Sequence, residues 1–115
     1  MTYKWVKIQP TNGPELQYLT QKAFAKNGRI PFCLGGTRAE NNLLAEAYSR
    51  FKYVHLLYSA DKLIGLIYGN SFNQGEVECV EISLIGGFAG LDAEAILNEY
   101  RQTLPANIRV FINIQ

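Results

Sequence analysis

The chain has 115 residues, of which 48% are hydrophobic and 18% charged, and its formal net charge is +1. This length fits one domain, because two separate cores of about half the size would each be marginally stable. The balanced charge gives no basic excess for nucleic acid, and no segment has the length and hydropathy of a membrane span or a secretion signal. We therefore expect a single cytoplasmic domain, residues 1–115, with neither nucleic acid nor membrane as partner.

The residues that could hold a metal or form a disulfide are few. Cys33 and Cys79 lie far apart and form no Cys-x-x-Cys pair, which is typical of buried free thiols in a reducing compartment. His55 is the only histidine, so a zinc site cannot be completed in the usual way. Its apolar neighbours favour a structural role within a strand, and we expect no metal.

The first part of the chain predicts one strand and then a helix. Residues 3–9 alternate apolar side chains with lysines, which is typical of a short edge strand. Asn12, Pro14 and Glu15 form a helix start, and the apolar spacing that follows predicts a helix over residues 14–26.

A second helix is predicted from a capping box. Thr37 and Glu40 stand at the two positions whose side chains satisfy each other's unpaired N–H groups, so a helix should run from 38 to about 51. The apolar spacing predicts this buried side: Leu43, Leu44, Ala47, Tyr48 and Phe51.

From Tyr53 the apolar period changes to two, and a hairpin of two strands is predicted over residues 53–69. Residues 70–75 predict a polar loop, and residues 76–85 a third strand, expected to be central and covered on both sides. A glycine turn at 86–90 then leads into an amphipathic helix that Pro105 ends. Residues 108–114 predict the last strand.

The predicted fold class is therefore α/β (α+β), with a mixed, mostly antiparallel central sheet flanked by helices. The element order is strand, helix, helix, three strands, helix, strand. The glycine turn is a possible anion site, because unpaired N–H groups at a helix start carry partial positive charge. Its glycines could equally serve only to reverse the chain tightly between strand and helix.

This order of elements resembles the GNAT-type N-acyltransferase superfamily, over nearly the whole chain. In that family a motif of Arg or Gln, two residues, Gly, any residue, then Gly or Ala holds the pyrophosphate of acyl-CoA. Leu84, Gly87 and Ala89 occupy these positions, so leucine replaces the polar first residue. The resemblance implies acetyl-CoA or another acyl-CoA as co-substrate, bound by Ile85, Gly86, Gly87, Phe88, Ala89 and Gly90.

Glu81 is the catalytic base that the resemblance implies, since family members place a glutamate on this strand beside the acyl carbonyl. A carboxylate partly buried on an apolar strand face would have a raised pKa, suited to taking a proton from an amine. The alternative is a structural glutamate paired with Lys or Arg at the sheet margin.

Two functions remain open from the sequence. One is an acyl-CoA-dependent N-acyltransferase of reduced or lost activity, because the family's final helix and two strands would follow Gln115 and are expected to be absent or supplied by a second subunit. The other is a non-catalytic protein-binding module, such as an inhibitor, an immunity protein or a regulatory homodimer. Such a dimer would form through the exposed edge of the sheet at the last strand.

Overall fold

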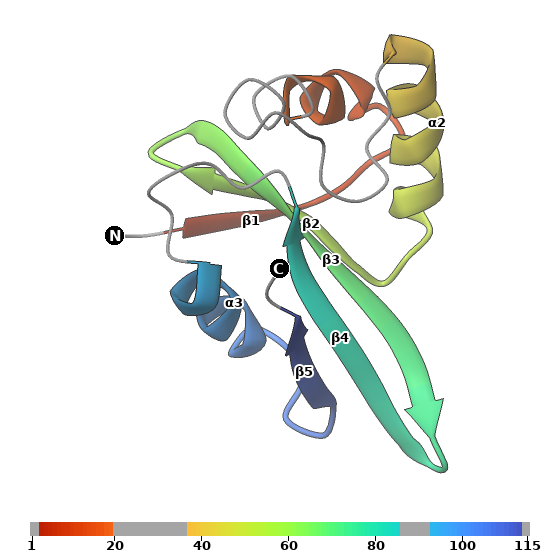
Figure 1. Ribbon diagram of the computed structural model, residues 1–115, viewed down its shortest axis with the longest axis vertical. Coiled ribbons are helices and arrows are strands. Elements are labelled where there is room, and N and C mark those ends of the chain that lie inside the picture. Colours follow the sequence, from red (N-terminus) through yellow and green to blue (C-terminus); the bar gives the residue numbers. More distant parts are fainter. Residues whose placement is uncertain (1–2, 20–36, 86–92, 114–115) are drawn as a thin grey trace.

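The computed structural model describes residues 3–19, 37–85 and 93–113 (Figure 1). Residues 13–19 are helical. The other elements, in chain order, are β1 (Tyr3–Lys7), α2 (Arg38–Ser49), β2 (Tyr53–Ser59), β3 (Lys62–Gln74), β4 (Val77–Ile85), α3 (Ala93–Arg101) and β5 (Arg109–Asn113). The strands form one sheet in the order β1-β2-β3-β4-β5, antiparallel except for the parallel pair β4 and β5. The predicted fold class is confirmed.

The β2–β3 hairpin forms as predicted and fixes the centre of the sheet. Ala60 and Asp61 both have positive φ angles, 50° and 63°, as a two-residue turn that matches the strand twist requires. Ser59 therefore pairs directly with Lys62, and a bulge between Leu57 and Tyr58 shifts the register once. The alternating side chains of β2 enter two different cores, one on each face.

The predicted polar loop at residues 70–75 is wrong over most of its length, because β3 continues to Gln74. Asn70 to Gln74 pair residue by residue with Glu81 to Val77 of β4. The side chains of this part of β3 are exposed. Polar residues therefore occur within a strand here, although the sequence pattern predicts strands only where apolar residues alternate. The β3–β4 hairpin consequently extends beyond the helices, as Figure 1 shows at its lower end.

Helix α2 begins where the capping box predicts. The Thr37 hydroxyl accepts a hydrogen bond from the Glu40 N–H at 3.1 Å and donates one to the Glu40 carboxylate at 2.8 Å. The structure thus confirms the N-terminal boundary of this helix from a purely local signal.

The predicted buried side of α2 is partly wrong. Asn41, Ala45 and Tyr48 are buried and Leu44 is half-buried, whereas Leu43 is 68% exposed. The other exposed members of the predicted set are Ala47 and Phe51. The cause is tertiary: Ala45 and Tyr48 pack in one cluster with Leu16, Val54 and Leu56, so contacts with residues distant in the sequence decide which side of α2 is buried.

Two hydrophobic cores lie on opposite faces of the sheet. Helix α2 and residues 13–19 form the first, over β2 and β3, with this buried set: Ile8, Leu16, Leu19, Ala45, Tyr48, Val54, Leu56 and Leu66. Helix α3 forms the second, with this set: Tyr53, Leu57, Ile67, Val80, Ile82, Ile96, Leu97, Tyr100 and Ile108. Among the described residues, no helix is long and apolar enough to cross a membrane.

Candidate functional site

The candidate site is built around β4, which pairs with β3 on one side and β5 on the other. Parallel neighbours need a crossover connection, and α3 lies in that connection. Helix α3 packs on one face of β4, whereas the core beneath α2 contains no described residue of β4 or β5. We call the second face the open face. Its side chains include those of Asn70, Phe72, Val77, Cys79, Glu81, Arg109 and Phe111.

Glu81 lies in the middle of the open face. Asn70 of β3 is its partner on one side and Phe111 of β5 on the other. Its side chain is exposed, so the expected partial burial is wrong. Cys79 on the same face is fully buried, so the expected cover on both sides of β4 is found at Cys79 and not at Glu81. Within the described part of the chain Glu81 also forms no ion pair, so the structural alternative is not observed there. The carboxylate is accessible to a ligand.

Two phenylalanines lie on the strands that flank β4: Phe111 is the register partner of Glu81, and Phe72 is the register partner of Cys79. The rings of Phe72 and Phe111 stack with centroids 6.2 Å apart and planes 20° from parallel. Their side chains remain 36% and 40% exposed. Cys79 lies between these strands and is fully buried as a free thiol, as predicted. The pair therefore forms an apolar surface next to the carboxylate.

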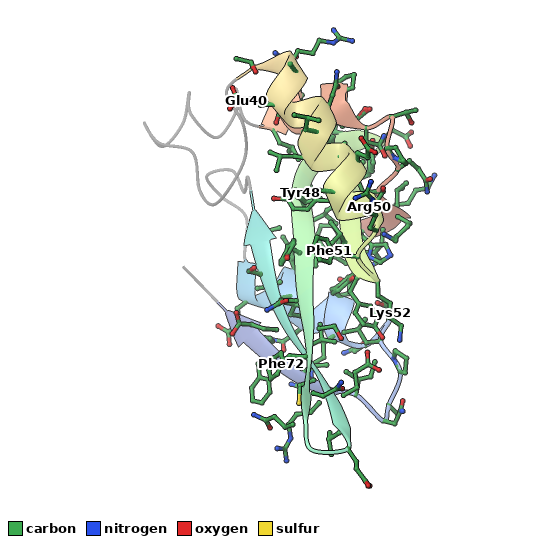
Figure 2. The ribbon with its side chains drawn as sticks, turned by 90° about the vertical axis from the view of Figure 1, so that its right-hand side faces the viewer. Glu40, Tyr48, Arg50, Phe51, Lys52 and Phe72 are labelled. Atoms are coloured by element: carbon green, nitrogen blue, oxygen red, sulfur yellow. The ribbon has the colours of Figure 1, made fainter. Side chains whose placement is uncertain are left out.

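The paired glutamate of this strand is Glu78, on the face opposite Glu81. One oxygen of its carboxylate accepts hydrogen bonds from Tyr53 at 3.4 Å and Ser71 at 3.3 Å, and lies 3.4 Å from the ammonium of Lys52. Tyr53 and then Glu78 raise the pKa of Lys52. Figure 2 shows Lys52 and Phe72 on opposite sides of the β3–β4 hairpin. Glu78, and not Glu81, is therefore the glutamate of this strand that is paired with a lysine.

The residues predicted to bind acyl-CoA lie mostly outside the described residues. Ile85 is the last residue of β4, and the structure describes its backbone place in the strand. Gly86, Gly87, Phe88, Ala89 and Gly90 fall in the segment 86–92, outside the described residues. Helix α3 begins at Ala93, directly after that segment. Acyl-CoA binding by the glycine turn therefore stays a prediction. In the sequence, the turn lies between the end of β4 and the start of α3.

The chain is similar to a known protein in its three-dimensional structure but not detectably in its sequence. No family model matches the chain, and no curated protein matches it by sequence. The solved structure of an acetyltransferase from Thermus thermophilus superimposes with a TM-score of 0.67 at 16% identity, over 97% of this chain and 75% of that one. The chain has a GNAT-like fold. At this identity the likeness shows the fold alone, which the order of elements in the sequence had predicted.

Metal ligands are not gathered in the described part of this GNAT-like domain. Among those residues, no three of His, Cys, Asp or Glu lie close enough together to hold a metal ion.

His55 lies on the α3 side of the sheet, where it contacts Tyr100. The Tyr100 hydroxyl is 2.7 Å from Nδ1 of His55, and the two rings meet edge to face at 5.4 Å. Tyr100 is 1% exposed, and burial followed by the charge of Tyr53 raises its pKa. The phenol therefore stays protonated and forms a hydrogen bond with neutral His55, in which the tautomer of the imidazole decides which of the two groups donates. This contact anchors α3 and lies on the face opposite Glu81, so the predicted structural role of His55 fits its position.

The His55 contact predicts a loss of stability in mild acid. Burial, and then the charge of Lys7, lower the pKa of His55 below its usual 6.5. Below pH 6.5 the unfolded chain therefore binds a proton that the folded chain binds only at lower pH, so the free energy of unfolding falls as the pH decreases. Urea unfolding at pH 7.5 and pH 5.5 measures this fall. A His55→Gln variant should show a smaller fall, and equal falls in both proteins would contradict the assignment.

Proposed function

We propose that this GNAT-like domain binds acyl-CoA and transfers the acyl group to an amine. The observation that carries the proposal is the β4–α3–β5 unit, within a fold shared with an acetyltransferase. In this unit the segment after Ile85 joins the carboxyl end of β4 to the start of α3. Ligands of open α/β sheets bind beyond the carboxyl ends of strands, and helix starts favour phosphate groups. The pyrophosphate of acyl-CoA suits this junction.

Glu81 is the proton acceptor in this proposal. Its carboxylate takes a proton from the ammonium group of the acceptor, and the neutral amine attacks the thioester carbonyl. Main-chain N–H groups polarise that carbonyl. As the nitrogen–carbon bond forms and the carbon–sulfur bond breaks, the second amine proton goes to the departing CoA thiolate. The products are an amide, free CoA thiol and one released proton.

Acetyl-CoA should stabilise the protein against heat. A ligand present at 100 times its dissociation constant raises the free energy of unfolding by about 2.7 kcal/mol, which is readily seen as a higher melting temperature. ATP at equal concentration is the matched control, because it carries phosphates without the pantetheine arm. An unchanged melting temperature at millimolar acetyl-CoA would exclude the acyltransferase proposal, and an equal shift with ATP would reduce it to phosphate binding.

Replacing Glu81 should impair catalysis without unfolding the protein. Loss of a general base lowers kcat/KM by about 100-fold or more. We expect this for Glu81→Gln in an assay of CoA thiol release from acetyl-CoA and an amine. Its unfolding free energy should stay near that of the parent, because Glu81 is exposed. The control is Glu76→Gln, an exposed glutamate at the turn between β3 and β4. Equal kcat/KM in all three proteins would remove Glu81 from the mechanism.

A second candidate function is a non-catalytic module that binds protein, including a second copy of itself. The observation that favours it is the position of β5 at the end of the strand order of the described sheet. Its Phe111 side chain is exposed, and edge strands with exposed apolar side chains pair readily with other chains. If the protein is such a binding module, we expect a homodimer that forms through the β5 edge of the sheet.

Light scattering tests the homodimer. We expect twice the mass of one chain at concentrations above the dissociation constant. Phe111→Asp should reduce the mass to that of one chain, because it places a charge at the paired edge. Val77→Asp, at the far end of the β3–β4 hairpin, should leave the mass unchanged. A single-chain mass for the parent protein at high concentration would contradict the edge interaction.

A further inference from the structure

The open face combines an apolar surface with one charge of each sign. The Phe72 and Phe111 rings stack across it, and both remain more than one-third exposed. Glu81 is the residue directly beside Phe111 in the strand register, and Arg109 lies at the register position beside Cys79. Both charged side chains are exposed. A surface of this kind selects ligands by shape and by charge together.

We propose that the open face binds the acceptor of acyl transfer, and that the acceptor is a primary amine with one positive charge and an apolar carbon skeleton. This inference rests on the proposed function. The stacked rings offer contact area to an aromatic or alkyl skeleton, which gains from leaving water. The ammonium group then lies between the Glu81 carboxylate and the face of a ring, and both attract a cation.

Arg109 excludes acceptors that carry further positive charge. It pairs with Cys79, two residues along β4 from Glu81 and on the same face, so a second ammonium group on the aromatic pair would meet a guanidinium of like sign. Repulsion of this kind discriminates between ligands as effectively as a favourable contact does. Polyamines and other polycations are therefore disfavoured, and the same argument applies to basic segments of protein.

The aromatic contribution is tested by two amines that share a two-carbon spacer. We expect kcat/KM with acetyl-CoA to be at least about tenfold higher for 2-phenylethylamine than for ethanolamine, as apolar contacts of this size allow. Phe111→Ala should remove most of this preference, with Phe72→Ala as the second variant if the first fails to fold. Leu43→Ala, which truncates an exposed apolar side chain on α2, should keep it.

The contribution of charge is tested by pentylamine and cadaverine, which share a five-carbon chain and differ by one ammonium group. The parent protein should prefer pentylamine, and Arg109→Gln should reduce that preference while leaving the preference for 2-phenylethylamine over ethanolamine intact. Equal use of all four amines, or a preference that survives in both phenylalanine variants, would overturn the inference and leave acyl transfer standing.

The inference stays testable if acetyl-CoA does not bind and the proposed function fails. The full chain labelled with nitrogen-15 is then titrated with 2-phenylethylamine and, separately, with ethanolamine. Amide shifts at Phe72, Glu81 and Phe111 that occur with the first amine alone support an amine-binding surface. The absence of such shifts at millimolar concentration, or equal shifts with both amines, overturns it.

Discussion

The parallel pairing of β4 with β5 is the constraint on which the rest of the molecule depends. Antiparallel neighbours need only a turn, whereas a parallel neighbour needs a crossover that returns the chain to the same end of the sheet. The crossover contains α3, whose Ile96, Leu97 and Tyr100 are buried against one face of the sheet. Helix α2 and residues 13–19 lie over β2 and β3 on the other face. Among the described residues, neither helix covers Glu81 on the open face of β4, and its side chain is exposed.

Local signals in the sequence predicted the elements and their order, because those signals act over a few residues. The capping box at Thr37 placed the start of α2, and the period-two pattern with a short turn placed the β2–β3 hairpin. Features set by distant contacts were not predictable in this way. The side of α2 that meets the sheet depends on packing against residues 13–19, β2 and β3. The full length of β3 depends on pairing with β4, which allows exposed polar residues within a strand.

The same limit applies to the site. Sequence alternation places Glu78 and Glu81 on opposite faces of β4, but it does not tell which one is paired. Lys52, Tyr53 and Ser71 decide this by converging on Glu78 from β3 and from the chain at the start of β2. The contact between His55 and Tyr100 joins residues 45 positions apart, and the sequence around either residue gives no local signal that predicts it. The aromatic pair is likewise invisible before β5 is known to lie beside β4.

The distribution of charge separates the two ends of the proposed reaction. Eleven basic and ten acidic residues leave the chain almost neutral, so little long-range attraction is available for a polyanionic co-substrate. Main-chain N–H groups at a helix start bind phosphate without basic side chains. With Leu84 where the family has Arg or Gln, the proposed binding of acyl-CoA would depend more on such groups. Under the proposed function, side-chain chemistry is therefore concentrated on the open face, where the acceptor amine would be selected, and substitutions there would report on specificity separately from acyl-CoA binding.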